Sequence, residues 1–159
     1  MPRIVDMRAP TDGRQSETAV WVARGVRRLL SAQGFSTITE LPLSNGKRAD
    51  IVAVTREGIV IIVEIKSSIT DFRADTKWLT YREHCDRFYF AAPEIVPTSI
   101  FPENAGLIIA DAYGATVMRE AELHKISGAT RRAVLLAFAR TAADRLHLLA
   151  DPERDSNLL

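Results

Sequence analysis

The chain has 159 residues, of which 47% are hydrophobic and 26% charged, and its formal net charge is +1. These values are ordinary for one globular domain with a real core, and they exclude a uniformly basic surface for nucleic acid. The single cysteine excludes an intrachain disulfide, no apolar run approaches the roughly 20 residues of a membrane helix, and the N-terminus lacks a signal-peptide pattern. We therefore expect a cytoplasmic protein that does not enter a membrane. Its single domain should cover residues 16–150, between a flexible N-terminal arm (1–15) and a C-terminal tail (151–159).

A first helix is predicted from Glu17 to about residue 33. Ser16 is suited to cap its start, and Gly34 suits the position after its last turn. The spacing of the apolar residues Ala19, Val22, Ala23, Val26, Leu29 and Leu30 is helical. The other face carries Arg24, Arg27 and Arg28, which are either solvated or in contact with phosphate.

Three strands are predicted next, over residues 35–41, 49–55 and 59–66. The turn signal Asn45-Gly46 predicts a two-residue hairpin loop that pairs Leu41 with Asp50. The following loop, Arg56-Glu57-Gly58, predicts a three-residue hairpin with a left-handed glycine at its end. That second loop pairs Thr55 with Ile59, so residues whose numbers sum to 114 lie opposite each other.

This register brings three charged side chains together at the open end of an apolar hairpin. Asp50 lies opposite Glu64, and Lys66 lies on the same face because side chains alternate along a strand. Buried carboxylates are rare unless they are paired or bound to metal, so the cluster is typical of an active site. The other reading is that the strand emerges at residue 64 and Glu64 pairs with Lys66 or Arg48 in solvent.

The second half of the chain completes an α/β pattern. Ser68 and Asp71 mark the start of a helix that should extend to about His84, with Trp78 and Tyr81 packed in the core. A fourth strand (86–92), a long proline-marked connection that could cover a site, and a hairpin (106–110 and 115–119) follow. The last helix, 129–150, is apolar over more than one face, so we expect it to be buried in the core or in a homodimer.

Other catalytic patterns are weak. The histidines His84, His124 and His147 lack metal-ligand spacing, and Cys85 is better explained as a core residue than as a nucleophile. The sequence also contains no phosphate-binding loop of the Gly-x-x-x-x-Gly-Lys-Ser/Thr type.

The acid at the start of the second strand (Asp50), the Glu64-Ile65-Lys66 tripeptide ending the third and the helix that follows resemble the PD-(D/E)XK nuclease superfamily. Ala49 stands where the superfamily name has proline, which is not chemically required. More closely, a string of short motifs over roughly residues 17–145 looks like the MmcB-like bacterial DNA repair proteins: Lys47-Arg48-Ala49-Asp50, Glu64-Ile65-Lys66-Ser67-Ser68, Asp71-Phe72, Asp75-x-Lys77-Trp78-x-x-Tyr81 and Cys85-Asp86-Arg87-Phe88-Tyr89-Phe90-Ala91.

The resemblance implies a restriction-endonuclease-like fold, that is, a mixed β-sheet flanked by helices with a helix, three strands, helix, strand core and here a C-terminal helix. It implies a DNA nuclease in which Asp50, Glu64 and the Ile65 carbonyl bind Mg²⁺ or Mn²⁺ and Lys66 positions the water and stabilises developing charge. A third acid often joins such sites. Glu40 is the candidate by resemblance, although the Asn45-Gly46 register would turn it away, and Glu17 is the fallback.

DNA contacts should come from local cations because the net charge is near zero. The candidates are Lys47 and Arg48 beside the catalytic acid, Lys77 on the second helix, and Arg24, Arg27 and Arg28 on the first. The alternative function is a nucleic-acid-binding or assembly module that keeps the fold without the chemistry. An intact set of two acids and a lysine favours the enzyme.

Overall fold

The computed structural model describes residues 16–74 and 77–153. Its centre is one six-stranded sheet whose spatial order, β1 to β6, is also the order of the chain. The first three strands are antiparallel, β3, β4 and β5 are parallel, and β5 and β6 form an antiparallel hairpin. The strands are β1 (Ser36–Pro42), β2 (Arg48–Val54), β3 (Val60–Ile65), β4 (Arg87–Ala92), β5 (Gly106–Ala110) and β6 (Ala115–Arg119). The mixed sheet with flanking helices confirms the predicted fold class.

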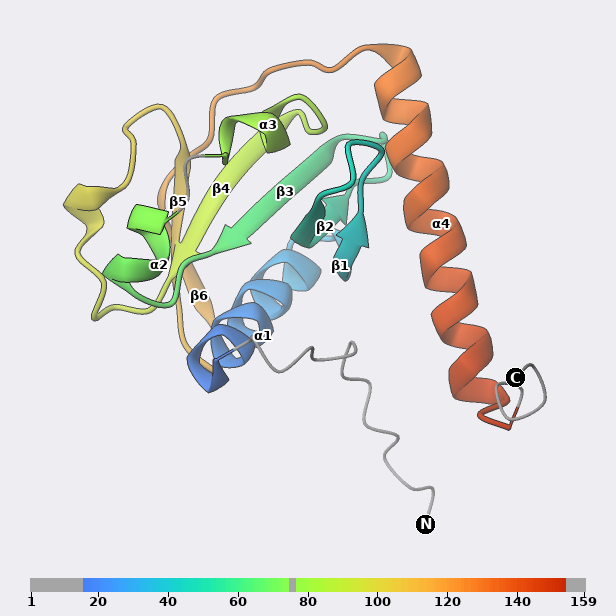
Figure 1. The fold of residues 1–159 in the computed structure, drawn as a ribbon, viewed down its shortest axis with the longest axis horizontal. Coiled ribbons are helices and arrows are strands. Elements are labelled where there is room, and N and C mark those ends of the chain that lie inside the picture. Colours follow the sequence, from blue (N-terminus) through green and yellow to red (C-terminus); the bar gives the residue numbers. More distant parts are fainter. Residues whose placement is uncertain (1–15, 75–76, 154–159) are drawn as a thin grey trace.

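Helix α1 (Glu17–Ala32) covers one face of the sheet (Figure 1). As predicted, it begins after Ser16, whose hydroxyl accepts a hydrogen bond from the Ala19 amide at 3.1 Å. Its buried stripe packs on inward residues of the central strands, in a cluster that includes Val22, Val26, Leu30, Ile51, Val63 and Ile65. Gly25 permits a close approach to the β5–β6 turn, because a Cβ there would lie 2.1 Å from the Asp111 carbonyl oxygen.

The opposite face is covered by α2 (Ile69–Ala74) and α3 (Leu79–Arg82), so the single helix predicted from Ser68 to about His84 is wrong. The aromatic packing explains the interruption. Phe72 and Trp78 both pack against the ring of Phe90, with ring centroids 5.5 and 5.3 Å away. Residues six positions apart point about 120° apart on one helix, so an unbroken helix would not present both to the same ring.

The connection between β4 and β5 is anchored to this same face. It contains a short 3₁₀ turn, η1 (Thr98–Ile100), followed by Phe101, which is buried. The Phe101 ring lies 5.1 Å from that of Phe72, centroid to centroid. Phe101 therefore anchors the predicted long connection to the core next to α2, while most of the connection's other residues are exposed.

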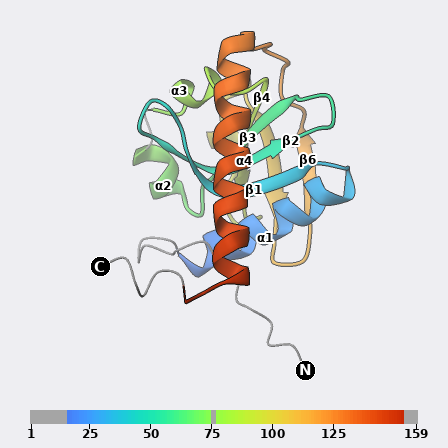
Figure 2. The ribbon, with the colours of Figure 1, turned by 90° about the vertical axis from the view of Figure 1, so that its right-hand side faces the viewer.

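Helix α4 (Gly128–Ala150) runs along β1 at the side of the sheet (Figure 2). Val134 is its one fully buried residue, whereas Leu136 and Leu146 are 52% and 67% exposed. The expectation of a helix buried in the core is wrong, because α4 contacts the sheet along one side; the homodimer stays a prediction. In the described part of the chain, no helix is long and apolar enough to cross a membrane.

The two hairpins differ in how well the sequence predicted their register. In β2–β3, Ile51 pairs with Val63 and Val54 with Val60, and Gly58 has φ of 82°, all as predicted. In β1–β2, however, Leu41 pairs with Ala49 and not with Asp50. The Leu43 amide donates to the Lys47 carbonyl at 2.7 Å, so three residues, not two, form the tip of this turn.

Candidate active site

Asp50 and Glu64 meet at the open end of the β2–β3 hairpin. The Asp50 amide donates to Glu64 Oε1 at 3.0 Å, and the Ile65 amide donates to Asp50 Oδ2 at 2.8 Å. Each carboxyl group also acts on the pKa of the other. Glu64 is 5% exposed, so the solvent-exposed reading of this residue is wrong.

Burial is the largest cause of the raised pKa of both acids. The pKa of Glu64 lies well above its ordinary value, first because the carboxyl is buried and second because of the charge on Asp50. Burial also raises the pKa of Asp50, and the backbone hydrogen bond from Ile65 only partly opposes it. Two adjacent buried carboxyl groups therefore share a proton more readily than they both ionise.

Lys66 supplies the positive charge of the cluster. It is 7% exposed, and its amide donates to the Ala91 carbonyl at 2.9 Å, which fixes the end of β3 against β4. Its ammonium group opposes the rise in pKa of both Asp50 and Glu64. The structure therefore brings together the three residues that the β2–β3 register predicted to converge.

The donor chemistry of this pair suits a hard divalent cation. Mg²⁺ takes oxygen ligands and is commonly held by one or two carboxylates. A cation placed between Asp50 and Glu64 would replace the shared proton and offset the Asp50 charge that raises the pKa of Glu64. No group of three or more His, Cys, Asp or Glu side chains that could hold a metal occurs within residues 16–74 and 77–153.

Neither candidate for a third acid joins this pair. Glu40 is buried, and its carboxylate forms an ion pair with Arg48. Glu17 is exposed in the first turn of α1, which packs on the other face of the sheet. The acid that does act on Asp50 is Asp71, whose charge contributes to the raised Asp50 pKa. Its position at the Ser68–Asp71 helix start, shortly after Lys66, was the signal for it.

The predicted cationic residues lie on two sides of the molecule. Lys47 packs over the Tyr81 ring, 5.5 Å from its centroid, and hydrogen-bonds to Thr80, so it joins the β1–β2 turn to α3. Arg48 is paired with Glu40, and Lys77 is exposed just before α3.

On α1, the three arginines differ from one another. Arg27 Nε donates to Thr37 Oγ1 at 3.0 Å, and Arg28 Nη1 donates to the Tyr113 carbonyl at 3.2 Å, while Arg24 is exposed. Arg27 therefore serves the packing of α1 on β1, and the reading of all three as a solvated face does not hold for it.

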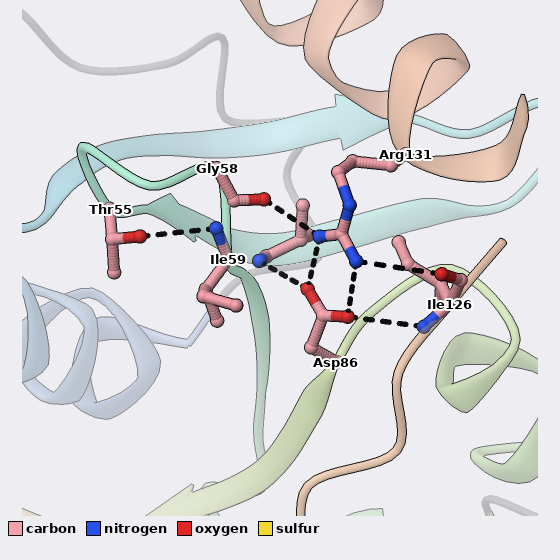
Figure 3. Close-up of polar contacts among 7 residues, drawn as sticks. Thr55, Gly58, Ile59, Asp86, Ile126 and Arg131 are labelled. Atoms are coloured by element: carbon pink, nitrogen blue, oxygen red, sulfur yellow. Dashed lines mark hydrogen bonds and ion pairs between the residues drawn. The ribbon is translucent and has the colours of Figure 1, made fainter. Parts of the chain in front are cut away.

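The sequence did not predict a structural role for Asp86, whose carboxylate is buried away from the candidate site. Asp86 is fully buried and forms a two-pronged ion pair with Arg131 of α4, at 2.6 and 2.8 Å (Figure 3). Asp86 also accepts the amides of Val60 and Ile126, at 2.8 and 3.1 Å. Burial alone would raise the pKa of Asp86, but these hydrogen bonds outweigh it and hold the pKa below its usual value.

Cys85 has the role that the sequence favoured. It is buried, and burial raises the pKa of its thiol to about 12. The thiolate, which is the reactive form, is therefore negligible at neutral pH, and a cysteine nucleophile is not supported.

A cavity of about 280 Å³ lies away from the acids, on the α1 side of the sheet. It is lined by residues such as Leu30, Phe35, Ile61, Tyr89 and Glu120, and by none of Asp50, Glu64 and Lys66. The site predicted from the sequence therefore lies at the end of the β2–β3 hairpin and not in this cavity.

The mixed sheet, its flanking helices and the acid pair define an α/β protein with a candidate acidic site at the end of β3. The chain belongs to the DNA repair protein MmcB-like family, whose model matches residues 6–153. It is similar to the solved structure of the SPO1766 protein of unknown function from Silicibacter pomeroyi, with 40% identity, a TM-score of 0.84, and coverage of 87% of this chain and 95% of that one.

A crystal structure of a repair endonuclease from Pyrococcus abyssi also matches, with 19% identity, a TM-score of 0.35, and coverage of 50% of this chain and 39% of that one. No curated protein matches this chain.

Proposed function

We propose that this protein is a metal-dependent nuclease of the PD-(D/E)XK type that hydrolyses DNA phosphodiesters in repair. The observation that carries the proposal is the buried pair Asp50 and Glu64, joined by the hydrogen bond from the Asp50 amide to the Glu64 carboxylate, with Lys66 beside it. Burying two like charges side by side is costly unless a cation balances them. Membership of a DNA repair family supports DNA as the substrate.

Each residue of the cluster would have a separate task. Asp50, Glu64 and the carbonyl of Ile65 would hold Mg²⁺ or Mn²⁺, which when bound supplies Lewis acidity and a more acidic water. The hydrogen bonds from the Asp50 and Ile65 amides to the carboxylates of Glu64 and Asp50 keep the two carboxyl groups aligned before the substrate arrives. Lys66 would stabilise the negative charge that develops on the phosphate oxygens and orient the attacking water.

One observation favours the alternative of a nucleic-acid-binding module without chemistry. Asp50 Oδ2 and Glu64 Oε1 each accept an amide from the neighbouring strand, so the acids also hold the hairpin together. A purely structural pair would satisfy the same hydrogen bonds. Cleavage assays decide between the two functions.

The test uses the full chain with branched, single-stranded and duplex DNA in Mg²⁺ or Mn²⁺, with EDTA as the metal-free control. We expect cleavage that EDTA abolishes and that Glu64→Gln lowers by on the order of 10³-fold. Lys66→Ala should keep Mn²⁺ binding in calorimetry but slow single-turnover cleavage, because its role lies in the transition state. DNA binding without cleavage in either metal would establish the idle module instead.

A further inference from the structure

Glu40 has an unusual backbone for a buried acidic residue. Among the residues that the structure describes, it is the one non-glycine residue with positive φ, at 54°. It lies between the pairs Thr39–Ile51 and Leu41–Ala49, so it stands next to Asp50 on the neighbouring strand. A strained conformation persists only where surrounding contacts enforce it, and such residues cluster at functional sites.

Arg145 of α4 provides those contacts. Its guanidinium donates to two successive carbonyl oxygens, that of Thr39 at 2.5 Å and that of Glu40 at 3.1 Å. Burial lowers the pKa of Arg145, and the negative charge of Glu40 opposes this effect. Arg145 therefore fixes the backbone of Glu40 and also lies within electrostatic reach of its side chain.

The side chain of Glu40 in turn holds Arg48. Their ion pair joins Glu40 Oε2, on a side chain that is 9% exposed, to Arg48 Nε, on a side chain that is 51% exposed. The Arg48 carbonyl accepts a hydrogen bond from the Tyr81 hydroxyl at 3.2 Å, so the backbone of Arg48 is held as well. The half-exposed guanidinium of Arg48, which lies two residues before Asp50, is thus fixed by the buried carboxylate of Glu40.

We propose that Glu40 is a positioning residue that holds Arg48 for a backbone phosphate of DNA, and that Arg145 holds Glu40 in the conformation this requires. The inference rests on the proposed function, and it gives Glu40 a different task from that of the third metal ligand. A guanidinium presents five N–H donors in a planar fork, so it can contact a carboxylate on one side and a phosphate on another. Fixing this long side chain before binding removes much of the entropy cost of ordering it.

The direction in which Glu40→Gln changes DNA affinity distinguishes a positioning role from a simple charge effect. Glu40→Gln removes a negative charge near the DNA path, so Coulomb attraction alone predicts tighter binding. Positioning predicts weaker binding, by about 3- to 10-fold, because Arg48 loses its anchor. Arg48→Met should weaken binding to a similar degree and reduce the slope of log affinity against log salt by about one.

The experiment measures fluorescence anisotropy of a labelled DNA duplex in EDTA over a KCl series, with Mn²⁺ calorimetry on the same proteins. In the Arg48→Met background, Glu40→Gln should have no further effect, since both act through one guanidinium. Arg145→Met should weaken binding, Arg145→Lys should restore part of it, and the exposed Arg140→Met on the same helix is the matched control. Mn²⁺ affinity should be unchanged in all of them.

The possible results are distinguishable. If the unaltered protein binds no DNA in EDTA and cleaves none in Mg²⁺ or Mn²⁺, the proposed function fails and this inference fails with it; if it cleaves DNA but does not bind it in EDTA, only the inference fails. If it binds DNA and Glu40→Gln binds as tightly or more tightly, the inference is wrong while the proposed function stands. A roughly tenfold loss of Mn²⁺ affinity in Glu40→Gln with unchanged DNA affinity would make Glu40 a metal ligand and overturn its positioning role.

Discussion

Replacing Asp50 with asparagine should have opposite effects on activity and stability. Cleavage should fall by on the order of 10³-fold, because the amide is a poor ligand and carries no charge. The metal-free fold should gain about 0.5–2 kcal/mol at neutral pH. The gain arises because the asparagine amide can donate to the Glu64 carboxylate, whereas two carboxylates in that position repel each other.

The pH dependence of this gain follows from the raised pKa values of Asp50 and Glu64. An acid whose pKa is raised by folding binds more protons in the folded state than in the unfolded state, so its stability contribution is complete below the unfolded pKa. That contribution is lost as the pH rises through the folded pKa. Thermal unfolding in EDTA should therefore show a larger gain for Asp50→Asn at pH 8 than at pH 5.

The control for this variant is Asp144→Asn, the same change at an exposed position on α4. It should alter neither cleavage nor unfolding temperature measurably. A lower unfolding temperature for Asp50→Asn at pH 8 would show that the acid pair stabilises the fold, and would remove the main support for a cation site.

The largest loss of stability is expected from Asp86→Asn, at about 3–5 kcal/mol. The substitution breaks the two-pronged bond to Arg131 and leaves that partly buried guanidinium, whose side chain is 20% exposed, beside a neutral amide that is fully buried. Because Arg131 also donates to the Gly58 carbonyl at 2.7 Å, the β2–β3 loop should lose part of its anchor as well. Urea unfolding at pH 7 measures the change.

The stability contribution of Asp86 depends on pH in the opposite direction to that of the Asp50–Glu64 pair. The pKa of Asp86 is lowered by folding, so its contribution is present above the unfolded pKa of about 3.9 and is lost as the pH falls through the folded pKa. The difference between the unaltered protein and Asp86→Asn should shrink between pH 7 and pH 3. Arg132→Met, an exposed neighbour of Arg131, should be neutral, and equal unfolding midpoints for Asp86→Asn and the unaltered protein at pH 7 would contradict the prediction.

The elements with strong local signals were predictable. The Arg56-Glu57-Gly58 loop fixed the β2–β3 register, and with it the meeting of Asp50 and Glu64, because loop length determines pairing over a short hairpin. The Asn45-Gly46 signal was misleading, since the chain uses these residues inside a longer turn closed by Leu43 and Lys47. One residue of difference in the loop changed the partner of every residue in β1.

Features that depend on distant residues were not predictable. Nothing near Asp86 in the sequence indicates that its partner is Arg131, which lies 45 positions away. The break between α2 and α3 depends on how Phe72 and Trp78 share the ring of Phe90, a tertiary constraint that overrides helical spacing. The exposure of α4 likewise depends on its packing beside β1, which the composition of the helix does not indicate.

The matching order of strands in space and in sequence has a consequence for how the protein folds. Every strand pairs with its neighbour along the chain, so the sheet can grow from short-range contacts at a modest cost in loop-closure entropy. The bonds of α4 are of another kind, since Arg145 reaches back 106 positions to the Thr39 carbonyl. Docking of this helix should therefore come late in folding, after the surface that receives it has formed, and the stability of the docked helix should limit how long the Glu40 backbone keeps its strained conformation.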